Sequence, residues 1–305
     1  MKILLLGKNG QVGWELQRSL AVLGEVVGVD TDSPPPLCAD FLDGNSLAAL
    51  VRSVAPRLIV NAAAHTAVDK AEAEAELAFA INATAVGTLA RESAALDACL
   101  VHYSTDYVFD GSGSTPWNET APPAPLSVYG RSKVAGEELI RQSGCRHLIF
   151  RTSWVYAARG ENFAKTILRL ARTRDSLSVI DDQVGAPTGA DLLADVTAHA
   201  IRSIAARPEL AGTYHVVAAG ETSWHGYAQH VLDFARRQGD PIRIAAGAVK
   251  PIPSSAYRQA APRPKNSRLD TAKFRDAFGL ALPPWQSGVD RMLAEVLAPN
   301  EAQSP

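Results

Sequence analysis

The chain opens with a buried strand, a glycine-rich turn and a helix, and this order constrains the fold more than any other feature. Residues 3–6 are apolar on both faces, which is typical of a strand inside a parallel sheet. The next seven residues follow the pattern G-x-x-G-x-x-G, and residues 14–23 carry leucines at helical spacing. Glycines let the backbone approach a pyrophosphate, which then lies at the positive end of the helix. The pattern therefore predicts a dinucleotide-binding fold.

A carboxylate at the end of the second strand supports this prediction. The strand at residues 26–29 ends in Asp30, which lies 17 residues past Gly13. This spacing is close to the one at which an acidic side chain holds an adenosine ribose. Asp30 should repel a 2′-phosphate and favour NAD(H), whereas Lys8 could offset that charge. Both NADH and NADPH therefore stay open as cofactors.

Strands and helices alternate through the first half of the chain, which predicts an α/β fold with a Rossmann-type, doubly wound parallel sheet. Further strands are expected at residues 58–60, 100–103 and 148–151, and helices at 46–54, 69–95 and 128–142. In the second half the expected strands are 177–180 and 213–217, and the helices are 162–172, 190–205, 224–238, 271–278 and 285–297. Residues 34–36, 249–267 and 299–305 are expected to lack regular structure.

This distribution predicts two domains. Residues 1–155 would form the dinucleotide-binding Rossmann domain, and residues 187–205 could return to it. Residues 156–305 would form mainly a smaller α+β substrate-binding domain. Small or polar residues follow two strands, at residues 61–66 and 104–106, where the carboxyl ends of parallel strands meet a ligand crevice.

A tyrosine and a lysine stand four residues apart in the helix expected at residues 128–142. Tyr129 and Lys133 would share one face of this helix. An ammonium beside a phenol lowers the pKa of the phenol, so Tyr129 could donate or accept a proton near neutral pH. The alternative interpretation is an ordinary tyrosine–lysine pair on a surface helix.

Charge and cysteine spacing exclude several other classes of protein. The net charge of −2 argues against binding to nucleic acid or a membrane surface. Cys38, Cys99 and Cys145 have no metal-ligand spacing and predict buried thiols in a reducing cytoplasm. The apolar start of the chain breaks at Gly7, too early for a signal peptide. We expect no transmembrane helix, because no apolar run approaches about 18 residues.

Three motifs in order resemble the extended short-chain dehydrogenase/reductase family: the glycine turn, the Ser/Thr after the fourth strand and Tyr-x-x-x-Lys. Within it, the chain resembles the dTDP-4-dehydrorhamnose reductase family over nearly its full length. The resembling segments are residues 7–20, 60–72, 102–109, 148–157, 163–170, 182–188 and 263–269.

The resemblance implies an NAD(P)H-dependent reduction of the C4 ketone of dTDP-4-dehydro-β-L-rhamnose to dTDP-β-L-rhamnose. This is the last step of dTDP-L-rhamnose synthesis for cell-surface polysaccharide such as O antigen. Nicotinamide C4 would deliver the hydride and Tyr129 the proton. Lys133 would lower the Tyr129 pKa and bind the nicotinamide ribose, and Thr105 would bind the carbonyl oxygen. The enzyme would be cytoplasmic, and a homodimer is an open expectation.

Two sets of binding residues follow from the resemblance and the strand ends together. The expected cofactor contacts are Gly7, Gly10, Gln11, Val12, Gly13, Asp30, Asp40, Phe41, Ala62, Ala63, Ala64, Tyr103, Tyr129 and Lys133. The expected substrate contacts are Thr105, Asp106, Tyr129, Trp154, Asn162, Arg263 and Asn266, with Arg268 as a further diphosphate candidate.

Some members of the resembling family bind Mg2+ through carboxylates at a dimer interface. Glu15, Asp191 and Glu295 are the positions to consider, but they share no ligand spacing. The sequence therefore predicts no metal site, and Mg2+ stays a minor alternative.

Two other functions remain as alternatives. The chain is also similar to the regulatory β subunit of methionine adenosyltransferase, a binding protein, but the combination of Thr105, Tyr129 and Lys133 favours catalysis. An epimerase or 4,6-dehydratase could share the fold. A dehydratase needs an acid–base pair, usually Asp-Glu, after the threonine, whereas Asp106-Tyr107 follows Thr105 here.

Overall fold

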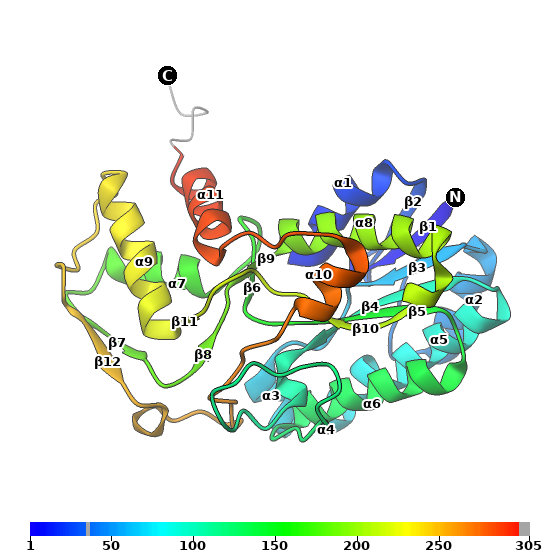
Figure 1. Ribbon diagram of the computed structural model, residues 1–305, viewed down its shortest axis with the longest axis horizontal. Helices are drawn as coiled ribbons and strands as arrows, with labels where there is room; N and C mark the ends of the chain where they lie inside the picture. The colour runs from blue at the N-terminus through cyan, green and yellow to red at the C-terminus, as the bar shows by residue number, and fades with distance from the viewer. Residues whose placement is uncertain (35–36, 299–305) are drawn as a thin grey trace.

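A computed structural model describes residues 1–34 and 37–298 of the chain (Figure 1). Most of the predicted proline loop and the whole of the predicted tail, residues 35–36 and 299–305, lie outside the described residues. Within the described part, no helix is long and apolar enough to cross a membrane.

A six-stranded, wholly parallel sheet forms the centre of the larger of two units, in the order β10-β5-β4-β3-β1-β2. Its strands are β1 (Lys2–Leu6), β2 (Glu25–Val29), β3 (Leu58–Asn61), β4 (Cys99–Thr105), β5 (His147–Thr152) and β10 (Gly212–His215). The order reverses between β1 and β3, which is where a doubly wound sheet binds its ligand. The predicted α/β fold class is confirmed.

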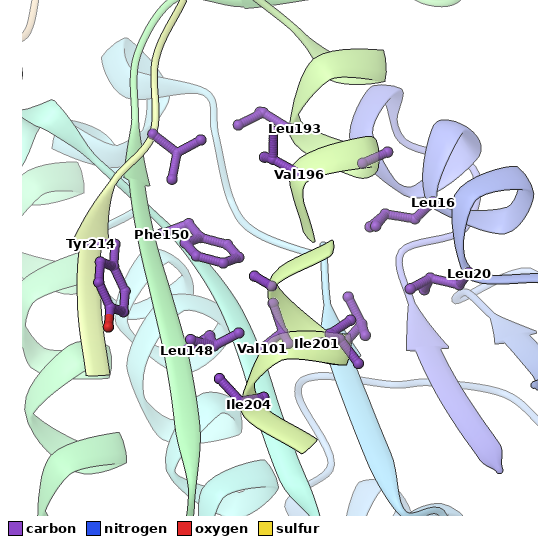
Figure 2. Packing of buried hydrophobic residues seen from close by; sticks show 14 of the residues in the cluster. Leu16, Leu20, Val101, Leu148, Phe150, Leu193, Val196, Ile201, Ile204 and Tyr214 are labelled. Atoms are coloured by element: carbon purple, nitrogen blue, oxygen red, sulfur yellow. The ribbon is translucent and has the colours of Figure 1, made fainter. Parts of the chain in front are cut away.

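Helices cover both faces of this sheet (Figure 1). On one face lie α1 (Gln11–Ala21) and α8 (Ala190–Ala206), which pack against each other and against the strands. Figure 2 shows the resulting core, in which Ile201 of α8 lies between Leu16 and Leu20 of α1 on one side and Leu148 and Phe150 of β5 on the other. Each fully buried leucine contributes about 1.5–3 kcal/mol. On the other face lie α2 (Gly44–Val54), α5 (Ala85–Ala95) and α6 (Val128–Ser143).

The helix predicted for residues 69–95 was wrong as a single element. The structure divides it into α3 (Val68–Ala73), α4 (Ala75–Phe79), a π-helical turn (Ala80–Thr84) and α5. Asn82 lies in the π turn, and its buried amide exchanges two hydrogen bonds with the main chain of His65 and donates to the Ser132 hydroxyl. π turns of this kind frequently accompany functional sites.

A second, smaller unit holds three helices and three short strand pairs. The helices are α7 (Phe163–Ala171), α9 (Trp224–Arg237) and α11 (Trp285–Leu297), which share one core. The strand pairs are β7 (Leu177–Ile180) with β12 (Val249–Ile252), β8 (Val184–Gly185) with β11 (Thr222–Ser223), and β6 (Val155–Tyr156) with β9 (Thr188–Gly189). Single 3-10 turns lie at Asp106–Val108, Pro208–Leu210 and Ser254–Ala256.

The expectation that residues 249–267 lack regular structure was wrong at the start of the segment. Strand β12 forms there because Val249 is buried and the segment pairs with β7.

Several segments after residue 155 pack with the large sheet. Strand β10 pairs with β5, α8 lies on α1, and α10 (Ala272–Phe278) adds Phe274 and Phe278 to the same core. A domain boundary near residue 155 stays a prediction. Any such division has to assign α8, β10 and α10 to the domain that contains the six-stranded sheet.

Candidate active site

The glycine turn packs so tightly that side chains would not fit at two of its positions. Gly7 has a φ of +81°, and a Cβ there would lie 2.7 Å from the amide nitrogen of Ala63, after β3. A Cβ on Gly13 would lie 1.9 Å from the carbonyl oxygen of Gly7. Gly10 is the N-cap of α1 and has no side chain to occupy the first-turn N–H groups. This cradle fits a pyrophosphate at the helix N-terminus.

The Asp30 carboxylate lies beside this turn at the end of β2. It accepts a hydrogen bond from the main-chain N–H of Asn9 at 3.1 Å. Lys8 does not pair with it directly, because the Lys8 ammonium donates to the Ser33 hydroxyl at 3.0 Å. That hydroxyl in turn accepts from the Asp30 main chain. The Asp30 carboxylate and the Lys8 ammonium therefore both lie at the end of β2, where the adenosine ribose is expected. One charge favours NADH and the other favours NADPH, so the geometry leaves the choice of cofactor open.

The other expected cofactor residues differ in their surroundings. Gln11 and Val12 begin α1, and residues 62–64 follow β3. Asp40 is exposed and holds the main chain of Leu42, whereas Phe41 is buried in the core. The Tyr103 hydroxyl bonds Thr197 of α8 at 2.7 Å, so this side chain faces the helix layer.

Thr105 and Asp106 form a buried pair where β4 ends. The Thr105 hydroxyl donates to the Asp106 carboxylate at 3.1 Å and accepts from the Tyr107 amide. Only 3% of Asp106 is exposed. Burial raises the pKa of Asp106 to about 6, against the hydroxyls of Ser267 and Thr105, which lower it. Strongly shifted pKa values cluster at functional sites, so Asp106 is a candidate for a functional role.

Tyr129 reaches this pair because α6 begins directly against the 3-10 turn after β4. Ser127 caps the helix by accepting from the Gly130 amide, and a Cβ on Gly130 would lie 2.3 Å from the Tyr107 carbonyl oxygen. The rings of Tyr107 and Tyr129 meet edge to face at 5.5 Å. Burial raises the pKa of Tyr129 to about 12, although the neighbouring Thr105 hydroxyl lowers it.

Lys133 is almost fully buried, with 1% of the residue exposed. Its Nζ donates to the Tyr103 carbonyl oxygen at 2.6 Å and lies 3.1 Å from His102 Nε2. Burial lowers the pKa of Lys133 to about 8, although Glu137 raises it. The predicted lowering of the Tyr129 pKa by Lys133 is not found in this arrangement, because Nζ is directed to β4 and burial dominates at the phenol.

Trp154 has a strained backbone two residues after the end of β5. Its φ is +50°, which is rare for a bulky residue and is associated with functional sites. The indole stacks on Trp224 with ring centroids 3.7 Å apart. A Cβ on Gly185 would lie 3.0 Å from the Trp154 ring, so a larger residue there would require the indole to shift. Sequence reasoning missed Trp224, since one aromatic residue at a helix start carries no recognisable signal.

The remaining polar residues expected at the substrate all have protein partners. Asn162 caps α7 by accepting from the Lys165 amide, and its nitrogen lies 3.5 Å from Gln11 Oε1. Arg263 pairs with Asp69 at 2.6 Å. Asn266 is buried and donates to main-chain carbonyl oxygens, and Arg268 pairs with Glu221. Their contact with substrate stays a prediction.

Glu15, Asp191 and Glu295, which share no spacing in the sequence, line one pocket together with Arg291. Arg291 lies 3.1 Å from Asp191 and offsets part of the negative charge. Burial and then Asp191 raise the pKa of Glu15. Across residues 1–34 and 37–298, no group of three His, Cys, Asp or Glu side chains is arranged to hold a metal. The structure thus gives no support to Mg2+ here.

The predicted thiols differ in their burial. Cys99 and Cys145 are buried, whereas Cys38 is only half-buried, so the expectation of three buried thiols was wrong at Cys38. Cys38 donates to the Thr31 carbonyl oxygen in the loop after β2.

A Rossmann-type sheet, a glycine cradle at its switch point and a tyrosine beside the fourth strand define a nucleotide-dependent oxidoreductase of the extended short-chain type. The model of the family described as the RmlD substrate binding domain matches residues 1–298. The chain belongs to this family, that of the dTDP-4-dehydrorhamnose reductases, and it is an oxidoreductase.

Curated relatives and solved structures agree with this assignment. The chain is 56% identical to dTDP-4-dehydrorhamnose reductase of Salmonella typhimurium, over 97% of this chain and 98% of the relative. It is 45% identical to the Burkholderia thailandensis enzyme of the same name, over 98% and 100%. The structure of the Bacillus anthracis enzyme in complex with NADP is 33% identical and superposes with a TM-score of 0.86, covering 96% and 99% of the two chains.

Proposed function

We propose that this enzyme reduces the C4 ketone of dTDP-4-dehydro-β-L-rhamnose to give dTDP-β-L-rhamnose, using NADPH or NADH, as the last step of dTDP-L-rhamnose synthesis. The observation that carries the proposal is the convergence of Thr105 and Tyr129 at the end of β4, beside the glycine cradle. The name shared by the relatives supports the substrate class. The proposed setting is the cytoplasm, and a homodimer stays a prediction.

The cofactor half of the proposal rests on the turn and on Asp30. A bound nicotinamide dinucleotide would supply the hydride that reaches the carbonyl carbon. The N–H groups at the start of α1 would hold its pyrophosphate, since Gly7 and Gly13 let the backbone approach. Asp30 would accept from ribose hydroxyl groups. The NADP in the Bacillus anthracis structure supports a nicotinamide cofactor.

The proton half of the proposal rests on Tyr129 and Thr105. With a pKa of about 12, Tyr129 keeps its proton at neutral pH, which is the state that a general acid needs. Tyr129 would donate this proton to the oxygen that becomes the alcohol, and the Thr105 hydroxyl would hydrogen-bond the same oxygen. A donor aimed at an oxygen that gains charge is typically worth about 2.7–4 kcal/mol.

The sugar and nucleotide would occupy the side of the crevice formed by the smaller unit. Asp106 and the Trp154 indole would contact the sugar, because both lie where β4 and β5 end. Asn162, Arg263 and Asn266 would contact the nucleotide. For Arg263 to bind a phosphate it would have to share its guanidinium with Asp69.

The test is the decrease in absorbance at 340 nm when enzymatically prepared 4-keto sugar is added to the protein with NADPH, and separately with NADH. We expect oxidation of the cofactor and one equivalent of dTDP-L-rhamnose as product. Saturable cofactor binding without turnover would contradict the proposal and favour the non-catalytic, partner-binding alternative. Release of a dehydrated sugar would favour the dehydratase alternative. A dTDP-glucose 4,6-dehydratase does share the fold, at 21% identity.

A further inference from the structure

A buried histidine that the proposed reaction does not use lies against the Lys133 amine. His102 is fully buried on β4, and its Nε2 lies 3.1 Å from Lys133 Nζ. On the other side of the ring, Nδ1 lies 3.1 Å from the side-chain nitrogen of Asn61. The register of β3 and β4 places Asn61 opposite His102. The sheet itself therefore fixes this contact.

The orientation of the Asn61 amide fixes the tautomer of His102. The Ala63 main-chain N–H donates to Asn61 Oδ1 at 3.1 Å, so the side-chain nitrogen has to face the ring. Because an amide nitrogen only donates, His102 Nδ1 accepts, and the proton of a neutral ring lies on Nε2. A cationic ring would set N–H against N–H. Burial also lowers the His102 pKa well below its ordinary value, so the ring is neutral.

His102 therefore presents an N–H group to Lys133. A neutral amine accepts this hydrogen bond through its lone pair, whereas an ammonium has only donors and would oppose it. The bond from Nζ to the Tyr103 carbonyl oxygen can form in either protonation state. The contact with His102 thus distinguishes between the two forms of Lys133 and disfavours the charged one.

The other ionisable groups around the amine are few. Glu137, one turn further along α6, favours the ammonium, but it is itself paired with Arg151 at 2.6 Å and with Arg141. Tyr129 lies one turn before Lys133 on the same helix. On β4 the facing group is His102. The balance at Nζ is therefore set by burial, the partly compensated carboxylate and the histidine.

We propose that Asn61 and His102 form a hydrogen-bonded chain that positions Lys133 and decides whether its amine carries a proton. Both are positioning residues, since they act on the reaction through Lys133 and not on the substrate. In the oxidising direction Tyr129 has to become a phenolate, which a nearby ammonium favours. The inference rests on the proposed function for its kinetic consequence and on the geometry alone for the tautomer.

The first experiment measures the tautomer in the full chain without substrate. With histidine labelled with 15N, two-bond 1H–15N correlation spectra at pH 7 distinguish Nε2–H from Nδ1–H rings. The His102 signal is identified by its loss in His102→Gln, with exposed His199→Gln as the matched control. We expect the Nε2–H form. A ring protonated on Nδ1, or on both nitrogens, would overturn the proposal.

The second experiment reverses the direction of the hydrogen bonds from Asn61 through His102 to Lys133 with an isosteric substitution. In Asn61→Asp, the carboxylate accepts from the Ala63 amide and also from the ring, so the His102 proton moves to Nδ1. Nε2 then accepts from an ammonium. We expect the spectra to show this switch. The acid limb of the kcat profile for dTDP-L-rhamnose oxidation should then move to lower pH, by about one unit.

The matched His199→Gln control should keep the wild-type limb. A switched tautomer with an unmoved limb would overturn the role assigned to His102 and leave only a packing contact. Failure of wild-type protein to turn over either sugar would refute the proposed function. In that case the spectra still show whether the His102 ring carries its proton on Nε2, as the hydrogen-bonded chain requires.

Discussion

Burial, and not a neighbouring charge, sets the protonation of the central tyrosine. The pKa of Tyr129 is raised to about 12 by burial, so the phenol is the resting form at neutral pH. This is the state required to donate a proton to a developing alkoxide. In the reverse direction the same burial would hinder formation of the phenolate.

We predict that Tyr129→Phe removes most turnover and leaves cofactor binding nearly unchanged. The substitution deletes the proton donor but keeps the ring against Tyr107. General acid catalysis contributes about 10²–10⁴-fold, so kcat should fall within that range. Steady-state kinetics with saturating 4-keto sugar and a cofactor titration followed by fluorescence would measure the two quantities. A fall in kcat of less than about fivefold would be too small for a general acid.

A substitution at Asp30 tests which dinucleotide the enzyme prefers. We predict that Asp30→Ala shifts the preference towards NADPH, because it removes a carboxylate that repels a 2′-phosphate and keeps Lys8 in place. The measurement is the ratio of kcat/KM for NADPH and NADH in both proteins. Asp32→Ala, two residues further along the loop, serves as the control. An unchanged ratio in Asp30→Ala would show that the carboxylate does not face the ribose.

At the scale of elements, the start of α6 places Tyr129 beside Thr105. Gly130 allows this part of the helix to approach the 3-10 turn after β4 closely. We predict that Gly130→Ala lowers kcat more than it raises the KM for cofactor. The new Cβ would lie 2.3 Å from the Tyr107 carbonyl oxygen and push the helix start away from Thr105. Kinetics for both substrates would show this split.

Gly44→Ala in α2 is the matched control, because its Cβ would meet only the Thr88 hydroxyl at 3.5 Å. It should leave kinetics unchanged. Equal effects of the two alanine variants on kcat would contradict the placing role of Gly130.

A buried ion pair joins α6 to β5. Glu137 accepts from Arg151 through two hydrogen bonds and from the Ser104 hydroxyl beside Thr105. Removing one partner of a buried pair costs about 3–5 kcal/mol, whereas replacing both with apolar residues costs far less. We therefore predict that urea unfolding shows a large loss of stability for Arg151→Met and for Glu137→Leu, and a much smaller loss for the double variant. Additive losses in the double variant would contradict a coupled pair.

The sequence predicted the elements that its periodicity or glycines define, and it failed where a tertiary contact overrides them. The strand, turn and helix around residues 3–23 are local, so they were found. The break at Asn82 depends on Ser132, 50 residues away, and no local pattern announces it. The same holds for β12, which forms by pairing with β7 across the smaller unit.

The candidate site was predictable to a similar extent. Tyr129 and Lys133 follow from their spacing and Thr105 from the family resemblance, and the structure brings Thr105 and Tyr129 together. The direction of the Lys133 side chain was not predictable, because it depends on contacts with His102 and with the Tyr103 carbonyl oxygen on β4, about 30 residues away in the sequence. His102 has no motif of its own. Its one signal is that it precedes the polar strand end by two residues.

At the scale of the whole molecule, buried neutral histidines make stability depend on pH. Burial lowers the pKa of His215 to about 3, with Arg151 adding to the effect, and lowers that of His102 well below its ordinary value. Below about pH 6.5 the unfolded chain protonates both rings, whereas the folded protein does not. The unfolded state then binds more protons, so stability is lost as the pH falls.

One buried acid works in the opposite direction. Burial raises the pKa of Asp106 to about 6, so between about pH 4 and 6 the folded protein holds a proton that the unfolded chain has released. This contribution to stability is lost as the pH rises through that window. Asp69, with its pKa lowered to about 2 by Arg263, acts only below about pH 4. The lowered pKa of His147 and the raised pKa of Glu15 act in opposite directions in this window, so the two deeply buried histidines and Asp106 leave a net difference of about one proton.

We therefore predict that the free energy of unfolding rises by about 1.4 kcal/mol per pH unit between pH 4 and 6. Urea unfolding curves at four pH values in this range would measure the slope. His215→Gln removes one of the two histidine contributions, so its slope should fall towards zero even if the variant is less stable throughout. His199→Gln, at an exposed position, should keep the wild-type slope. A His215→Gln slope equal to that of the wild type would mean that this ring is protonated in the folded protein, despite its burial against Arg151.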